Sequence, residues 1–161
     1  MMVIYHDVGG SHSSATAANI HVNKLPIDRI PDKSELLSLP TFDKITKKDV
    51  GHLIYIGDDE FGSKVYTISV QYKANLVVPA LRDMYSEIIG NSNDLYLVST
   101  QPAVNIWMKI GGLSSRRLHL VKFGRPIVTY GTLKTYQNLI NIVKEVKFDI
   151  KNGINPSLNN H

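Results

Sequence analysis

The sequence predicts an α/β domain: a three-layer sandwich with a mostly parallel sheet, P-loop-like or Rossmann-like, that includes one β-hairpin. Short apolar runs rich in β-branched residues alternate with longer segments whose apolar residues recur at helical spacing. The chain has 161 residues, of which 43% are hydrophobic, so it is long enough for one domain with a core of its own.

The first part of the chain predicts one strand followed by one helix. Residues 2–6 form an apolar run that ends near two adjacent glycines, and residues 13–22 form an alanine-rich helical segment. Residues 23–48 contain three prolines, which confine this stretch to turns and one short helix over residues 33–39. Asp32 is expected to cap that helix.

The middle of the chain predicts a hairpin and a longer helix. Residues 52–57 and 64–70 read as strands, and the turn-forming residues between them predict that they pair as a hairpin. Apolar residues recur at helical spacing from Val77 to Ile88, and Gly90 is expected to end that helix.

The last part predicts two more strands and two helices. Residues 95–99 and 126–130 read as strands, and residues 104–117 read as a helix interrupted by two glycines. The clearest helical periodicity runs from Leu133 to Val146. We expect one domain over residues 1–147 and a flexible tail over residues 148–161, which are rich in asparagine.

Composition excludes several classes of function. The chain has no cysteine, which removes disulfides, thiolate zinc sites and cysteine nucleophiles and fits a cytoplasmic protein. We expect no signal peptide and no transmembrane segment. The net charge of +4 favours an anionic partner, but no basic stripe with interleaved aromatic residues predicts nucleic-acid binding. Trp107 and Met108 are expected to pack in the core or in a contact of a homo-oligomer.

The loop after the first strand is the strongest candidate for a binding site. Two glycines let the backbone turn tightly, and hydroxyl and imidazole groups follow at a helix N-terminus, a position that favours anions. We expect this loop to bind a phosphate through Gly9, Gly10, Ser11, His12, Ser13 and Ser14. The alternative is that these residues form only a turn and a helix cap.

A comparison with the Walker A pattern is partial. Ser13 keeps the hydroxyl position, but His12 stands where that pattern has lysine, so the loop reads as a degenerate P-loop. The apolar run that ends in Asp58 and Asp59 is similar to the strand that holds Mg²⁺ in P-loop proteins. Ser13, Asp58 and Asp59 are therefore the candidate metal ligands, with an ordinary polar hairpin turn as the alternative.

Two histidines and two arginines complete the candidate site. His6 ends the first strand and His12 lies in the loop, so both could act as general acid or base, although a strand-end histidine can also be structural. Arg116 and Arg117 follow two glycines and two serines, and their guanidinium groups suit phosphate. The alternative for the arginines is a solvated helix end.

Several segments together resemble an uncharacterised bacterial family known only as a domain of unknown function. The segments are YHDVGGSHSSATAANIHVNKLPIDRIP, LLSLPTFD, IGDDEFGSKVY, NIWMKIGGLSSRRLHLV and GRPIVTYGT. The resemblance implies a Gly-Gly-x-His-[ST]-Ser loop at residues 9–14, an Asp-Glu-x-Gly turn at residues 59–62 and a Gly-Gly-x-x-Ser-Arg-Arg segment at residues 111–117. It also implies that members often carry Cys-Tyr where this chain has Asp7 and Val8. It brings no settled activity, cofactor or substrate.

The sequence thus leads to one functional hypothesis and two rivals. The first is binding of a phosphorylated small molecule such as a nucleotide, with phosphoryl transfer or hydrolysis if the protein is an enzyme, and with Mg²⁺ as the cofactor in that case. The second is a non-catalytic module that sequesters or senses a nucleotide signal. The third is a regulatory or scaffold protein whose loop is vestigial.

Overall fold

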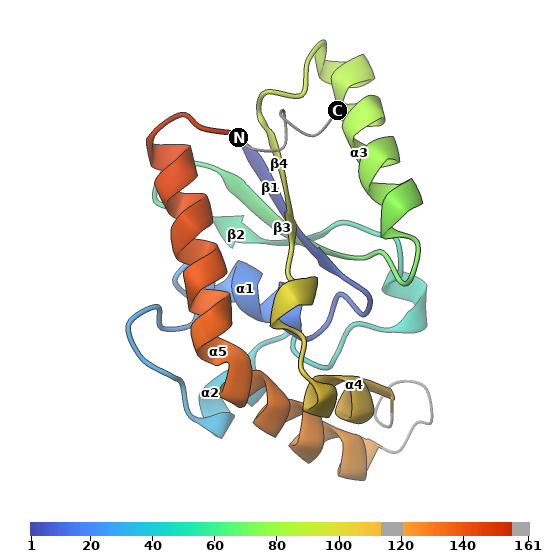
Figure 1. The fold of residues 1–161 in the computed structure, drawn as a ribbon, viewed down its shortest axis with the longest axis vertical. Helices are drawn as coiled ribbons and strands as arrows, with labels where there is room; N and C mark the ends of the chain where they lie inside the picture. Colours follow the sequence, from blue (N-terminus) through green and yellow to red (C-terminus); the bar gives the residue numbers. More distant parts are fainter. Residues whose placement is uncertain (114–120, 156–161) are drawn as a thin grey trace.

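A four-stranded mixed sheet forms the centre of the protein. The computed structural model describes residues 1–113 and 121–155 (Figure 1). The strands are β1 (Met2–Asp7), β2 (Ile54–Asp58), β3 (Lys64–Ser69) and β4 (Leu95–Ser99), in the order β2-β3-β1-β4. Strand β1 pairs in parallel with both β3 and β4, while β2 pairs antiparallel with β3. The predicted α/β class, the mostly parallel sheet and its one hairpin are confirmed.

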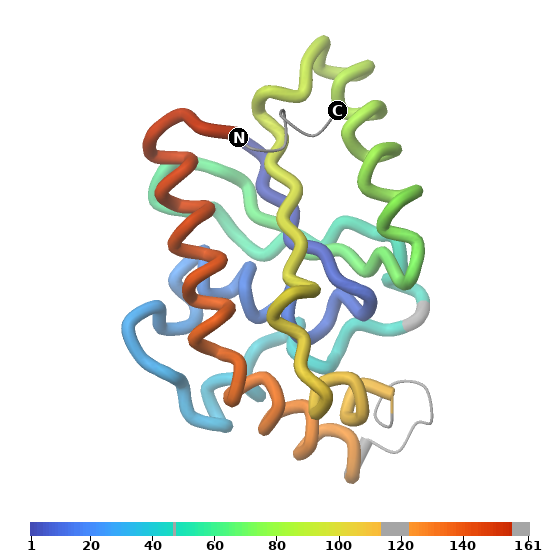
Figure 2. The backbone as a smooth tube through the Cα atoms, in the orientation of Figure 1, coloured from blue at the N-terminus to red at the C-terminus, as the bar shows by residue number. Residues whose placement is uncertain are grey.

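Helices flank this sheet on both faces. Helix α1 (Ser13–His21) and the long α5 (Val121–Lys151) cover one face, and α3 (Ala74–Ile89) covers the other (Figures 1 and 2). The short α2 (Lys33–Ser38) packs on α5, and α4 (Ile106–Gly112) crosses the N-terminal part of α5. Two single 3₁₀ turns, η1 (Lys47–Asp49) and η2 (Gln101–Ala103), lie in the connections.

The central strand β1 is buried on both faces because helices cover both. Val3 and Tyr5 belong to the larger apolar cluster with α1 and α5, whereas Ile4 belongs to the smaller cluster under α3. This alternation is the two-residue period of a strand. By the same alternation, the last two residues of β1 point to opposite faces of the sheet: His6 points toward α3 and Asp7 points toward α1.

Two helix ends confirm expectations from local sequence. Asp32 accepts from the Glu35 amide at 2.8 Å, and the Glu35 side chain accepts from the Asp32 amide, so a complete capping box begins α2. Helix α3 ends at Gly90, whose φ of 90° is the left-handed conformation that glycine adopts without strain.

The predicted strand over residues 126–130 is wrong, because this segment lies inside α5. Here α4 crosses α5 so closely that a Cβ on Gly111 would clash with the Val128 amide nitrogen. Thr129, inside the predicted strand, donates to the Arg125 carbonyl one helical turn earlier, and Thr132 just after it donates in the same way to the Val128 carbonyl. Close helix packing through glycine therefore outweighs the β-preference of these residues.

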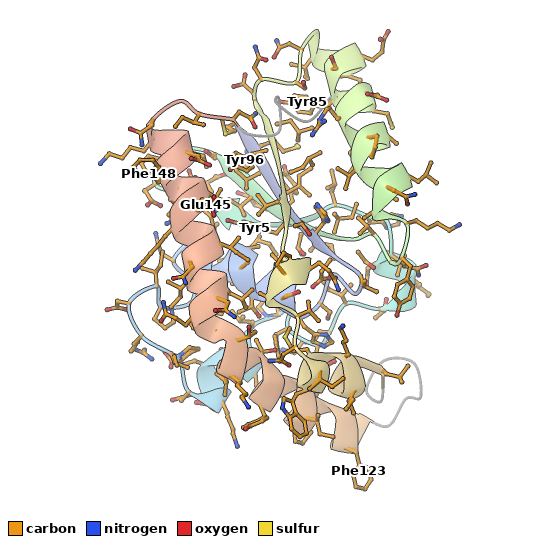
Figure 3. All side chains as sticks on the ribbon, in the orientation of Figure 1. Tyr5, Tyr85, Tyr96, Phe123, Glu145 and Phe148 are labelled. Atoms are coloured by element: carbon orange, nitrogen blue, oxygen red, sulfur yellow. The ribbon has the colours of Figure 1, made fainter. Side chains whose placement is uncertain are left out.

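Residues after 147 continue the last helix. Helix α5 runs to Lys151, and the buried Asp149 accepts a hydrogen bond from the Tyr96 hydroxyl at 2.7 Å. Figure 3 shows Tyr96 beside the C-terminal turns of this helix. The Asn155 side chain donates to the carbonyls of Asn93 and Leu95. None of the helices in the described ranges has both the length and the apolar content needed to cross a membrane.

The antiparallel direction of β2 separates the hairpin acids from the first loop. Asp58 pairs with Lys64, and Lys64 pairs in turn with Met2, so Asp58 lies at the amino end of β1. Asp7, at the carboxyl end of β1, pairs with Ser69 instead. The two loops therefore lie at opposite edges of the sheet.

Candidate functional site

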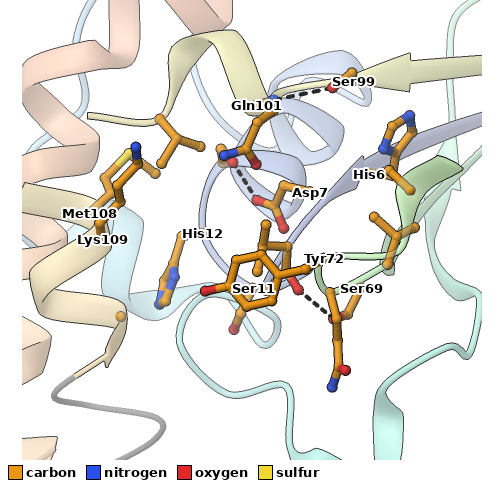
Figure 4. Close-up of a pocket in the computed structure, with 18 of the residues that line it drawn as sticks. His6, Asp7, Ser11, His12, Ser69, Tyr72, Ser99, Gln101, Met108 and Lys109 are labelled. Carbon is orange, nitrogen blue, oxygen red and sulfur yellow. Dashed lines mark hydrogen bonds between the residues drawn. The ribbon is translucent and has the colours of Figure 1, made fainter. Parts of the chain in front are cut away.

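A pocket of about 1080 Å³ opens at the carboxyl ends of β1, β3 and β4 (Figure 4). Its polar lining comes from the ends of these strands and from the first turn of α1, and one wall comes from α4. Parallel sheets bind ligands in this position, where successive connections leave a strand toward opposite faces. The loop after β1, which the sequence marked as the strongest candidate for a binding site, lines this pocket.

The carboxylate of Asp7 occupies the position expected for a bound anion. It accepts hydrogen bonds from the Gly10 amide, from the Ser14 amide at 3.0 Å and from the Ser13 hydroxyl. The N-cap residue His12 makes no capping bond with its side chain, so Asp7 satisfies the first turn of α1 from the end of β1. The Gly10 amide, which was predicted to bind phosphate, and the neighbouring Ser14 amide are therefore already bound to the chain's own acid.

The predicted hydroxyl groups are also integrated into the fold. Ser13 accepts from the Thr100 hydroxyl at 3.0 Å, and Ser14 accepts from the Thr67 hydroxyl at 2.9 Å. The Ser11 hydroxyl lies 3.4 Å from the Thr41 carbonyl oxygen. Ser11 and Ser13 line the pocket, and all three serines are buried. They tie the loop to β3, to the residue after β4 and to the segment after α2.

The two glycines of the loop have different roles. Gly10 has a φ of 67°, and a Cβ there would lie 2.7 Å from the Ser69 amide nitrogen. This position therefore requires glycine for both conformation and space. Gly9 lines the pocket, and within the described chain a Cβ built on it meets no other atom within 4 Å.

His12 is held by a carboxylate that sequence analysis did not identify. Its Nε2 lies 3.1 Å from Oδ1 of Asp43, and Oδ2 of Asp43 accepts from Nε of Arg125 at 2.9 Å. The Asp43 side chain is fully buried, and that of His12 is one-tenth exposed. His12 also lines the pocket, so this hydrogen bond anchors an imidazole at its edge.

Asp43 is itself held in a fixed position. Its backbone has a φ of 52°, a left-handed conformation that is uncommon outside glycine, and its amide donates to the Ser11 carbonyl at 3.1 Å. Asp43 lies 31 residues from His12 in the sequence, so no local pattern connects them. The only available signal was its place in the segment LLSLPTFD of the family resemblance.

His6 lies at the same pocket on the other side of Asp7 (Figure 4). His6 is only 7% exposed. This burial lowers the pKa of its imidazole, although the nearby Asp7 carboxylate acts in the opposite direction. No side-chain hydrogen bond is found for this ring within the described ranges. His6 is therefore a buried, neutral imidazole at neutral pH that faces the pocket with its hydrogen-bonding capacity unused.

Other elements complete the walls of the pocket. Ala74 and Asn75 bring the N-terminal turn of α3 to it, and Lys109 adds an ammonium group from α4. Tyr72 lies at the mouth of the pocket. The remaining walls are largely apolar and consist of Val50, Val70, Val104, Met108 and Leu113. Met108 is buried, while the half-exposed Trp107 packs edge-to-face on Tyr130.

The candidate metal ligands do not come together. Asp59 accepts from Nε2 of His21 at 3.0 Å and from the amides of Phe61 and Ser63, at the far end of α1 from Ser13. Asp58 is exposed and lies 3.8 Å from Lys64. Among the described residues, no three or more acidic or imidazole side chains form a group that could hold a metal ion. Arg116 and Arg117 lie outside the described residues.

The comparison with known proteins gives a family and no activity. No curated protein and no solved structure matches the chain. One family model, designated DUF3189 and described as a protein of unknown function, matches residues 2–148. The match covers the first loop, the hairpin and the helices that form the pocket, and it confirms the resemblance seen in the sequence. The chain is therefore a member of the DUF3189 family.

Proposed function

We propose that the pocket binds a small molecule that carries a phosphate group, such as a nucleotide. The observation that carries this proposal is the balance of charge in the lining. Asp7 is the one carboxylate among the described residues that line the pocket, and three donors already satisfy it. Lys109 is the one cationic side chain among the same lining residues, and the imidazoles of His6 and His12 add no negative charge, so the lining favours an anion.

The phosphate would lie beside His12 and Lys109 rather than on the amides of Gly10 and Ser14. Asp7 fills the position in front of those two amides, and a second anion there would meet its charge directly. The start of α3 faces the same pocket, and its N-cap residue Lys73 makes no capping bond with its side chain. The positive end of this helix adds to the attraction for an anion.

The rest of the ligand would contact the apolar walls. A pocket of about 1080 Å³ is much larger than a phosphate ion and suits a ligand of nucleotide size. Tyr72 is 84% exposed at the mouth, where its ring is available for stacking on a planar group. Gln71, Asn75 and Gln101 add side-chain amides that can bond the edge of such a group.

Thermal unfolding with added ligands tests this proposal. The probes are inorganic phosphate and a panel of nucleoside 5′-mono- and diphosphates, and a bound ligand raises the Tm by mass action. We expect at least one nucleotide to raise the Tm, and His12→Ala and Lys109→Gln to reduce that rise. His52→Ala is the matched control, because His52 is exposed and does not line the pocket. A panel without any shift, or equal shifts in all variants, would reject the proposal.

A further inference from the structure

The hydrogen bond to Asp43 determines which nitrogen of His12 carries the proton. A carboxylate oxygen accepts hydrogen bonds, so Nε2 of His12, 3.1 Å from Asp43 Oδ1, carries the hydrogen. In the neutral ring, Nδ1 then keeps its lone pair. Within the described chain this nitrogen has no hydrogen-bond partner, and it lies next to Gly112, another residue of the pocket lining.

Gly112 leaves this edge of the ring uncovered. A Cβ on Gly112 would lie 3.3 Å from Cε1 and 3.5 Å from Nδ1 of His12, so any side chain there would crowd the ring. Both residues line the pocket. The absence of a side chain on Gly112 keeps Nδ1 within reach of a water molecule or a ligand.

Asp43 is positioned to hold the ring in one orientation. Its second oxygen is bound by Arg125, and its amide is bound to the Ser11 carbonyl. The Phe42 ring packs edge-to-face on the imidazole, with 5.7 Å between ring centroids. A buried carboxylate that fixes the tautomer of an imidazole, whose other nitrogen faces a substrate, is the arrangement used for general base catalysis.

We propose that His12 is the proton-transfer group of a hydrolytic site for phosphate monoesters, with Asp43 and Arg125 as positioning residues. This inference rests on the phosphate binding proposed above. Nδ1 takes a proton from a pocket water as the water oxygen forms a bond to phosphorus. The ester P–O bond breaks, and its electron pair stays on the leaving oxygen. The imidazolium then returns the proton to that oxygen, so the products are an alcohol and inorganic phosphate.

Released phosphate is the direct readout. The probes are p-nitrophenyl phosphate and the nucleoside monophosphates of the binding panel, with the purified full chain as enzyme. We expect turnover by the wild-type protein and by His52→Ala. Asp43→Asn should lower kcat by about 10²-fold while KM changes less than about threefold, because the ring loses its tautomer but the phosphate keeps its binding groups.

Nitrogen NMR of the wild-type protein provides a second test that needs no variant to fold. Long-range ¹H–¹⁵N correlation should show neutral His12 with its proton on Nε2. A proton on Nδ1 would overturn the inference, as would a kcat in Asp43→Asn equal to that of the wild type. Binding of the probes without release of phosphate would overturn the hydrolytic step and leave the proposed binding function intact. Absence of any binding would overturn both.

Discussion

The two ends of α1 carry the same pair of groups in opposite settings. At the N-terminal end, Nε2 of His12 bonds to Asp43 at 3.1 Å, and at the C-terminal end Nε2 of His21 bonds to Asp59 at 3.0 Å. The second nitrogen distinguishes them. Nδ1 of His21 accepts from the Tyr5 hydroxyl at 2.7 Å, whereas Nδ1 of His12 faces the pocket.

This difference separates a structural pair from a candidate functional pair. The side chains of His21 and Asp59 are fully buried, and burial strongly raises the pKa of Tyr5, so Tyr5 stays protonated and donates. Every polar atom of the Tyr5–His21–Asp59 chain is thus satisfied within the protein, which stabilises the packing of α1 on the hairpin. The His12 pair leaves one nitrogen for an external molecule.

Removing each imidazole should give the largest contrast. His21→Ala leaves the buried Asp59 and Tyr5 hydroxyl without a partner, and we expect a loss of about 4 kcal/mol in the free energy of unfolding. His12→Ala leaves Asp43 bound to Arg125, so we expect a loss of about 1 kcal/mol. Urea unfolding measures both values. Equal losses would mean that the His12 pair is also mainly structural.

Replacing each glycine of the loop after β1 by alanine tests the backbone conformation and packing of this loop. Gly10→Ala places a side chain on a left-handed backbone and against Ser69, and we expect a loss of about 3 kcal/mol. Gly9→Ala is the matched control, since its methyl group meets open space, and a change within about 0.5 kcal/mol is expected. Similar losses in the two variants would contradict the described loop conformation.

The buried His21–Asp59 pair also predicts how the stability depends on pH. Burial lowers the pKa of His21, and its hydrogen bond to Asp59 offsets only part of this effect. Between pH 7 and pH 5 the unfolded chain, whose histidine pKa is about 6.5, binds more protons at this residue than the folded protein does, so the free energy of unfolding falls as the pH falls. His6 contributes with the same sign, because burial also lowers its pKa.

The variant His21→Gln isolates the contribution of the His21–Asp59 pair to this pH dependence. It removes one of the two depressed imidazoles, and we expect it to reduce the fall in stability between pH 7 and pH 5 by about 1 kcal/mol. Asp59 does not titrate in this pH range. Burial alone would raise the pKa of its carboxyl group, but hydrogen bonds from Ser63 and His21 lower that pKa overall, so Asp59 takes up its proton at lower pH. Urea unfolding at several pH values measures the slope, and an unchanged slope would show that folding does not shift the pKa of His21.

Local sequence predicted the parts of the fold whose physics is local. The capping box at Asp32 and the left-handed end of α3 at Gly90 depend on neighbouring residues, and both are found. The loop after β1 was also located, because adjacent glycines before a helix mark a position where backbone amides gather. The helix over residues 126–130 could not be predicted in this way, since it depends on contact with Gly111 in another helix.

The candidate site was predicted only in outline, for the same reason. His12 and His6 were identified from their place near the end of β1, and both line the pocket. Asp43 and Arg125 were not, because they reach His12 only through tertiary structure. The presence of Asp7 on the loop amides follows from the orientation of the last residue of β1, which depends on how the strand is buried.

The smallest expected effect on stability comes from a substitution beside Nδ1 of His12. Gly112→Ala adds a methyl group 3.5 Å from Nδ1 of His12 at the last residue of α4, so we expect the free energy of unfolding to change by less than about 0.5 kcal/mol. Because the methyl group crowds the ring edge that a ligand must reach, the Tm rise with the nucleotide probe should fall, corresponding to a severalfold weaker affinity. Gly9→Ala, also on the pocket lining but away from the ring, should keep that rise. A full Tm rise in Gly112→Ala would mean that the ligand does not come close to this edge of His12, which would contradict the proposed position of the phosphate beside His12.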